Sequence, residues 1–218
     1  MSDVSTTARR PNARAEKARA TRRRMREAAL RLFREQGYAA TPMQAIADEA
    51  GVAVQTLYFT FGTKRALLSE ILDIAIAGDE EPVATLDRPH IQALLDDPDP
   101  VAQLRGQARV TRTVYQRLAP ALEVVRGAAT ADPDLAALWE RSIQQRATVM
   151  ERFIAALAAK TALRDGMDQA TAVDIALALQ SPELIMFLTG QRGWSPEKYE
   201  QWLANALISE LLPAKLAE

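Results

Sequence analysis

Cysteine is absent from the 218-residue sequence, and histidine occurs once, at His90. Without thiols there can be no disulfide and no thiolate site for zinc or iron, and a single imidazole leaves His-dependent hydrolysis one candidate base. No nucleophile–base pair or phosphate-binding loop is recognisable either. We therefore expect no metal and no cofactor, and an all-helical enzyme is only a distant alternative.

Long apolar runs are also missing. No stretch has the length and composition that we expect of a membrane span, and the polar start from Met1 to Arg14 lacks the apolar segment of a secretory signal. The sequence thus predicts a cytoplasmic protein without a membrane partner.

Glycine is scarce, with nine residues, and the alternation of polar and β-branched residues that marks strands does not occur. The sequence is instead rich in Ala, Leu, Arg, Glu and Gln, which favour helices. Because 48% of the residues are hydrophobic, the chain can bury a core. These features predict an all-α protein.

The net charge of −1 hides an asymmetry between the two ends. Residues 1–65 carry 13 Lys and Arg against 6 Asp and Glu, whereas the remainder carries 14 against 22. A basic first third on an acidic body indicates a polyanionic partner at one end only.

Four helices are predicted within the basic third, after an arm at residues 1–16. Gly37 ends the first helix, 17–36, whose apolar face comprises Met25, Ala28, Ala29, Leu32 and Phe33. The second helix begins with Thr41 as its N-cap and Pro42 at its first position, and it stops at Gly51. A third helix covers 54–61 and a fourth 64–77.

The corner between the second and third helices has a distinctive spacing. Ala47 is small enough for a close helix crossing, Gly51 permits the positive φ of a tight turn, and Leu57 fills the corner. This spacing is typical of a DNA-binding helix-turn-helix, although any tight helical corner favours the same residue types.

The surrounding sequence resembles the TetR/AcrR family of repressors over residues 20–70, most clearly in TLYFTFGTKRALL at 56–68. The resemblance implies a helix-turn-helix domain at 17–64 and a ligand-binding and dimerisation bundle at 65–218, linked by helix 64–77. It assigns DNA contact to eight residues: Thr41, Gln44, Gln55, Thr56, Tyr58, Phe59, Thr60 and Lys64. Two positions depart from the family, since Ala53 replaces a capping Ser or Thr and Thr60 replaces a polar ring.

Some of these residues have a second interpretation. Tyr58 and Phe59 could be core aromatics, but Leu57 and Phe61 already occupy the inward face of the third helix. The basic run at 22–26 could be a solvated helix face rather than a phosphate contact.

Beyond a Pro-rich connector at 78–100, the sequence predicts helices at 100–118, 120–130, 134–160, 168–190 and 197–212, and Pro182 should kink or divide the helix at 168–190. The resemblance implies an internal cavity between the helices at 101–118, 134–160 and 168–190. Polar and aromatic residues there are candidate ligand contacts: Arg109, Arg112, Tyr115, Trp139 and Gln144. It also implies a homodimer built on the last two helices, whose apolar stripes could instead be intramolecular core.

These observations together predict a ligand-responsive DNA-binding regulator, in which a small, largely apolar effector releases a repressor from a palindromic operator. An activator or a co-repressor-dependent regulator of the same fold is the alternative.

Overall fold

The computed structural model describes residues 13–128 and 132–217, and every regular element in these ranges is a helix, as predicted. The chain divides into two compact units, Met1–Leu68 and Ser69–Glu218, a few residues beyond the predicted boundary. The first helix begins at Ala13, so the end of the predicted arm is helical. The rest of that arm, residues 1–12, lies outside the described residues.

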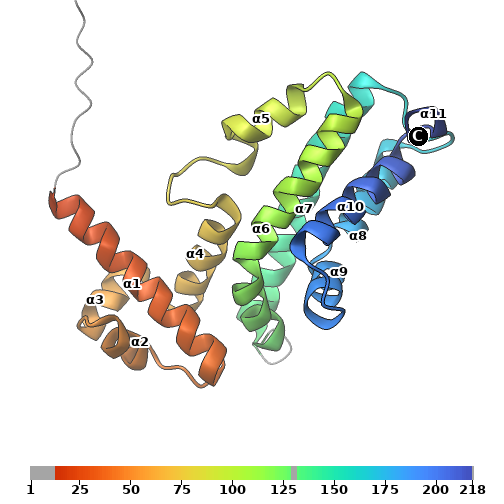
Figure 1. Cartoon of the computed structure of the whole chain (residues 1–218). Coiled ribbons are helices and arrows are strands. Elements are labelled where there is room, and N and C mark those ends of the chain that lie inside the picture. Colours follow the sequence, from red (N-terminus) through yellow and green to blue (C-terminus); the bar gives the residue numbers. More distant parts are fainter. Residues whose placement is uncertain (1–12, 129–131, 218) are drawn as a thin grey trace, which may run out of the picture. The chain divides into compact units, whose positions relative to one another are not determined.

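The amino-terminal unit contains α1 (Ala13–Gln36), α2 (Met43–Ala50) and α3 (Val54–Phe61). Figure 1 shows α2 and α3 packed beside α1. The predicted apolar face of α1 is buried, and Gly37 ends the helix with a φ of 86°. Thus the local pattern of apolar residues and glycines determines this unit.

Helix α4 (Lys64–Ala77) continues from the first unit into the second, which holds the remaining elements. They are η1 (Thr85–Asp87), α5 (Pro89–Asp96), α6 (Pro100–Ala128), α7 (Pro133–Lys160), α8 (Gln169–Leu179), α9 (Pro182–Ile185), the π-helical turn η2 (Met186–Gln191), α10 (Pro196–Leu211) and α11 (Ala214–Ala217).

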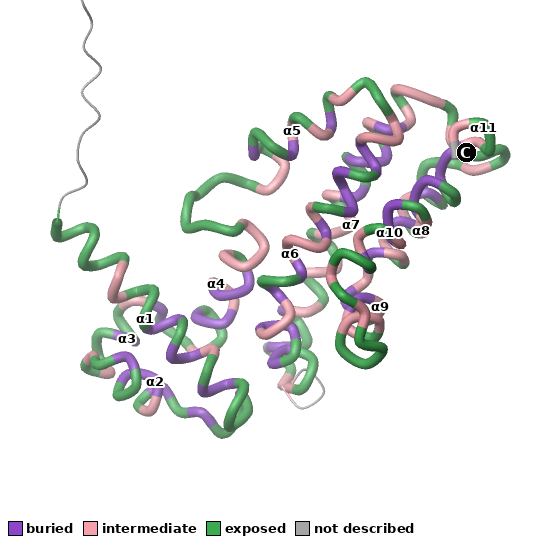
Figure 2. Tube along the Cα trace, viewed as in Figure 1, coloured by how far each residue is buried: buried purple, intermediate pink, exposed green. Residues whose placement is uncertain are grey.

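Helix α10 packs along α6 in the core of the second unit. Leu203, Leu207 and Leu211 are fully buried there, whereas Trp202 and Ala206 of the same helix are half-exposed. Figure 2 shows buried positions recurring along both helices. Three of the five apolar residues that we considered for dimerisation on the last helix are therefore intramolecular core.

Two prolines in the second unit have different effects. The predicted break at Pro120 is wrong, because α6 runs through this residue although Pro cannot donate a backbone bond. The predicted break at Pro182 is confirmed, since α8 stops at Leu179 and Ser181 caps α9 by accepting a bond from the Leu184 amide.

The expectation that no apolar stretch reaches the length of a membrane span was wrong. Gln169–Gln191, which covers α8 to η2, has a mean hydropathy of 1.4 and is long and apolar enough by length and composition alone. A helix in the interior of a helical bundle meets the same criterion.

The end of α4 is fixed to α6 by Arg117. Its Nε donates to the carbonyl of Ala75 at 2.9 Å, and its Nη2 donates to that of Ile76 at 3.2 Å. Gly78, which ends the helix with a φ of +90°, lets the guanidinium approach, since a Cβ there would lie 2.8 Å from Nη1. Arg117 thus satisfies carbonyls that the helix end leaves open and complements its dipole.

Just after α4, the buried Arg88 donates two hydrogen bonds to the Asp79 carboxylate, at 2.6 and 3.0 Å. These bonds hold the pKa of Asp79 well below its usual range, at about 2. The segment that follows α4 is therefore also anchored by a guanidinium.

We expect Arg117→Ala to lower the free energy of unfolding of the second unit by about 1 kcal/mol, because an exposed guanidinium bonded to two carbonyls contributes that order. Gly78→Ala should cost more, since it combines the same loss with strain at a positive φ. Because both variants remove one contact, the double variant should be no less stable than Gly78→Ala.

Urea unfolding of the four proteins measures this coupling, and Arg105→Ala, at an exposed position of α6, is the matched control. If the double variant lost as much unfolding free energy as the two single variants together, Arg117 would not act through the end of α4 at Gly78.

Candidate functional site

The corner between α2 and α3 has the predicted helix-turn-helix geometry. Ile46, Ala47 and Leu57 are fully buried where the two helices meet. Gly51 lies in the left-handed region at φ 66°, and its amide and that of Val52 donate to carbonyls of the last turn of α2, at 3.1 and 3.0 Å. Close packing at Ala47 and the turn at Gly51 therefore fix the orientation of α3 relative to α2.

Helix α3 presents two aromatic residues to solvent. Phe59 is 93% exposed and Tyr58 is 50% exposed, while Leu57 and Phe61 face inward. The interpretation of both as core residues is therefore wrong. A phenyl ring so fully exposed stabilises nothing within this unit and marks a surface suited to a partner.

The start of α3 is polar and open. Gln55 and Thr56 are exposed, and the N-cap Ala53 provides no side-chain acceptor for the first amides. Further along, the Thr60 hydroxyl donates to the carbonyl of Thr56 at 2.7 Å, so its proton is already used within the helix.

Thr41 does not have the predicted geometry. Pro42, not Thr41, is the N-cap of α2, and no side chain caps that helix. Thr41 is fully buried, and its hydroxyl donates to the carbonyl of Gly37 at 2.8 Å, with the carbonyl of Leu32 3.3 Å away. Its side chain closes the turn after α1 and is not presented to a phosphate.

Gln44 is exposed on α2, where its Nε2 donates to Asp48 Oδ1 at 2.8 Å. The exposed side chain is in a position compatible with contact to a base edge or, through its NH₂ group, to a phosphate.

Lys64 is held by the backbone of the preceding turn. Its Nζ donates to the carbonyls of Tyr38 at 2.7 Å and Thr41 at 3.0 Å and lies 4.4 Å from the centre of the Tyr38 ring. The ammonium therefore ties the start of α4 to the loop between α1 and α2, a structural role that the resemblance does not include.

The basic run on α1 has mixed environments. Arg26 is buried, Arg22 lies 5.0 Å from the centre of the Phe61 ring, and Arg24 donates to the Ala50 carbonyl at 3.4 Å. Arg23 pairs with Glu27 on the solvent side. The run is thus partly structural, and its remaining charge lies along the exposed side of α1.

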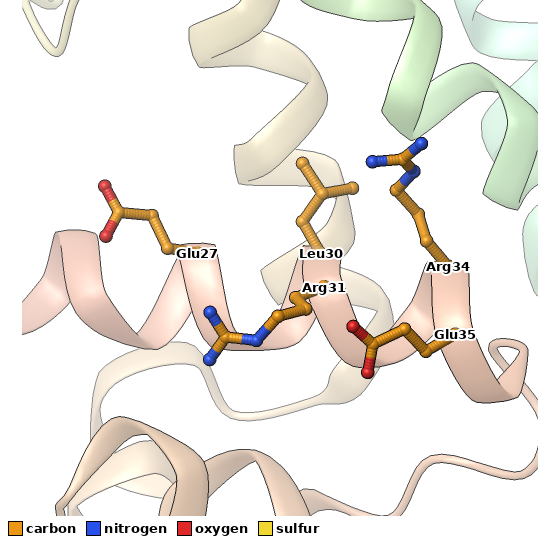
Figure 3. A pocket seen from close by; sticks show the side chains of 5 residues that line it. All are labelled: Glu27, Leu30, Arg31, Arg34 and Glu35. Carbon is orange, nitrogen blue, oxygen red and sulfur yellow. The ribbon is translucent and has the colours of Figure 1, made fainter.

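An open groove of about 560 Å³ follows another face of α1. Figure 3 shows the five side chains that line it: Glu27, Leu30, Arg31, Arg34 and Glu35. Arg31 also pairs with Glu49 of α2. All five residues come from one helix, and they carry both signs of charge, so the groove does not enclose a ligand.

In the second unit, a cavity of about 90 Å³ lies between α6, the α9–η2 segment and α10. Arg112, Gln116, Tyr115 and Tyr199 are among the residues that line it. Helices α7 and α8 do not contribute, so the predicted position of a cavity between α6, α7 and α8 differs from the one observed.

The five candidate ligand residues are only partly brought together. Arg112 and Tyr115 line the cavity, and Arg112 is neutralised by Glu200. Arg109 is exposed and lies 3.7 Å from the same Glu200. Trp139 is half-buried on α7, where Arg146 faces its ring, and Gln144 is exposed on that helix, so neither lines the cavity.

Sequence reasoning missed a set of buried polar residues on α6. Gln103, Gln107 and Thr111 are buried, and Tyr115 continues their four-residue spacing. Such spacing of polar residues on one helical face is visible in the sequence, but it marks a buried site only when neighbouring helices are known to cover that face.

The sequence model of the tetR family of bacterial regulatory proteins matches residues 26–71, which include all of α2 and α3. Among curated proteins, none is similar to the chain at a significant level.

Several solved structures share the fold. NalD of Pseudomonas aeruginosa, the secondary repressor of the MexAB-OprM multidrug efflux pump, is 22% identical, with a TM-score of 0.68 over 90% of this chain and 98% of NalD. SmeT, in complex with triclosan, is 18% identical, with a TM-score of 0.70 over 90% and 94%. A protein of Saccharomonospora viridis in complex with choline is 21% identical, with a TM-score of 0.64 over 88% and 98%. The helix-turn-helix of the chain therefore matches the tetR family of bacterial regulatory proteins, and the chain shares the fold of these solved structures.

Proposed function

We propose that the protein is a ligand-responsive repressor that binds a palindromic operator as a homodimer and leaves it when a small effector binds the second unit. The observation that carries this proposal is the exposure of Phe59 and Tyr58 on the second helix of a helix-turn-helix. This helix is the one that enters the major groove in such domains.

The DNA surface comprises the start and the outer face of α3 with the adjacent start of α2. Gln55, Thr56 and Gln44 can hydrogen-bond base edges or phosphates, while Phe59 can pack on a sugar or a thymine methyl group. The excess of basic over acidic residues in 1–65 favours this end for a polyanion. Lys64 and Thr41 stabilise the domain through their bonds to backbone carbonyls of the loop between α1 and α2.

A homodimer fits the size of the recognition element. One eight-residue helix makes few contacts, and two copies related by a two-fold axis match a palindrome. The second unit keeps half-exposed apolar side chains on α10, such as Trp202, and an exposed Phe187 on η2, which a partner could cover.

Effector binding is supported by the cavity next to Tyr115 and by relatives of the same fold solved with triclosan and with choline. Its lining is mostly apolar and its one guanidinium is paired, which suits a largely apolar effector with few polar groups. Because Arg117 fixes the end of α4 to α6, a shift of α6 would reach the helix that leads to the DNA-binding unit.

Selection of bound fragments from a random DNA library by the full-length protein tests the proposal. We expect a palindrome whose half-sites lie about one helical turn apart. Light scattering should give a particle of twice the 24.0 kDa chain mass. Binding should weaken steeply and linearly on a plot of log affinity against log salt.

Recovery of sequences without symmetry, or a monomer bound to DNA, would contradict the proposal. An activator would bind the same kind of site but raise transcription from it, and a co-repressor-dependent regulator would bind only with its effector, so a reporter assay on the selected site separates these alternatives.

A further inference from the structure

A row of polar side chains crosses the interior of the second unit. Gln103, Gln107, Thr111 and Tyr115 are spaced by four residues and so lie on one face of α6; we refer to them as the polar stripe. Their exposed fractions are 0, 3, 9 and 7%. Polar groups in a core destabilise it unless each finds a partner, so the partners of the stripe are informative.

Three members of the polar stripe are paired. Gln103 donates to the Phe153 carbonyl at 2.9 Å and accepts from Lys160 at 2.6 Å. Thr111 donates to the side chain of Gln180 at 2.7 Å, and Tyr115 donates to its carbonyl at 3.1 Å. The stripe thereby joins α6 to α7 and to the end of α8.

Gln107 is not satisfied. Its Nε2 faces Met150 Sδ at 3.1 Å and Gln180 Oε1 at 3.3 Å, but its Oε1 is buried without any partner. Rotating the Gln107 amide by 180° would place its Oε1 next to Gln180 Oε1. Two acceptors would then face each other, so the observed orientation is more favourable. The core thus contains a strong acceptor that lacks a donor.

Arg146 of α7 has a donor that lacks an acceptor, the reverse of Gln107. Its Nε is buried and unpaired, its Nη1 makes a long bond to the Tyr115 hydroxyl at 3.5 Å, and its guanidinium lies 5.9 Å from the centre of the Trp139 ring. Within residues 13–128 and 132–217, no carboxylate forms an ion pair with it. A half-buried guanidinium in this state favours an anion with two oxygens.

We propose that the effector is an organic acid with an apolar body, whose carboxylate pairs with Arg146 and whose far end donates a hydroxyl or N–H to Gln107. This inference rests on the proposed function and names the chemistry of its effector. Arg146 contacts Tyr115 and Gln107 contacts Met150, so the two groups are offset by four residues along α7 and by eight along α6. At 1.5 Å per residue these offsets are about 6 and 12 Å, and we expect the two ends of the ligand to be separated by a distance in this range.

Gln107 and Arg146 do not line the cavity of about 90 Å³, so the effector must displace side chains to reach them. Tyr115 belongs both to the polar stripe and to the wall of the cavity, so rotation of its ring would open the cavity toward them. Met150, which fills the space beside Gln107, is unbranched and repacks easily. The opposite wall includes η2, a π-helical turn of the kind frequent at functional sites.

Calorimetric titration of the full-length protein with defined probes tests the proposal. The probes are para-hydroxybenzoate, para-hydroxycinnamate and omega-hydroxyoctanoate, which span the expected separation. Cinnamate lacks the donor and para-vinylphenol lacks the carboxylate. We expect at least one hydroxy acid to bind, and para-hydroxycinnamate to bind at least about tenfold more tightly than either truncated probe.

Two variants show which residue binds the hydroxyl end of the probe and which binds its carboxylate end. Gln107→Met should reduce the affinity for para-hydroxycinnamate to that for cinnamate, and Arg146→Met should reduce it to that for para-vinylphenol. Arg152→Met, which removes an exposed cation from the same helix, should change neither affinity. A merely structural role would change the melting temperature of Gln107→Met without separating the probes.

The proposal is overturned if all three hydroxy acids bind more weakly than about 1 mM, or if para-hydroxycinnamate and cinnamate bind equally to the unaltered protein. Operator binding, measured on the same samples without probe, shows separately whether the DNA-binding half of the proposed function stands.

Discussion

Replacing Lys64 by Met should lower the free energy of unfolding of the amino-terminal unit by about 2–3 kcal/mol, because a charged donor is lost from carbonyls that are partly buried. Methionine keeps most of the apolar length of lysine, so the effect reports the ammonium and not a cavity. Loss of the contact with the Tyr38 ring acts in the same direction.

Thermal and urea unfolding, with hydrogen exchange to locate the loss, provide the measurement. Lys17→Met, at an exposed position of α1, is the control for loss of a positive charge near the DNA end. If Lys64 acted only through a phosphate, stability would be unchanged and the salt dependence of operator binding would fall by about one ion.

Phe59→Ala should weaken operator binding by about tenfold to a hundredfold, since burial of a phenyl ring against DNA contributes about 1.5–3 kcal/mol. The free protein should lose no stability, because that ring is 93% exposed. Tyr58→Ala should weaken binding by a smaller factor, as half of its side chain already packs on the domain.

Fluorescence anisotropy on the selected operator measures both variants, and circular dichroism checks their folding. Val83→Ala, which also removes an exposed apolar side chain but in the second unit, should bind as the unaltered protein does. Equal affinities for Phe59→Ala and Val83→Ala would show that α3 does not read the DNA.

The helix-turn-helix could be predicted from sequence because its determinants are local. Gly51 and Ala47 lie four residues apart within one corner, and the four-residue interval between Leu57 and Phe61 sets the inward face of α3. The exposed aromatic pair follows from that face by exclusion. Gly37 and Pro182 likewise mark boundaries through their own backbone geometry.

Roles that depend on tertiary contacts could not be predicted in this way. The carbonyls that hold Lys64 come from a loop 23 to 26 residues earlier, and the burial of Thr41 results from its packing against the end of α1. A proline inside a helix is tolerated or disruptive according to its neighbours, which explains the error at Pro120.

The candidate effector site was predicted least well. Apolar stripes show which face of a helix is buried but not which helix covers it, so the cavity was expected between the wrong helices. Polar residues were selected for their type rather than their spacing, and the unpaired state of Gln107 and Arg146 depends on groups from several helices.

Gln180 links three members of the polar stripe, because Gln107, Thr111 and Tyr115 all contact it. Each end of the stripe also has a neighbour of its own, since Gln103 contacts Phe153 and Tyr115 contacts Arg146. In the proposed binding mode, a substitution at Gln107 would alter the group that faces one end of the effector while Arg146 still holds the other end. Through gene duplication and single-residue changes along one helix, descendants of this chain would then acquire responses to new metabolites while keeping the proposed DNA recognition.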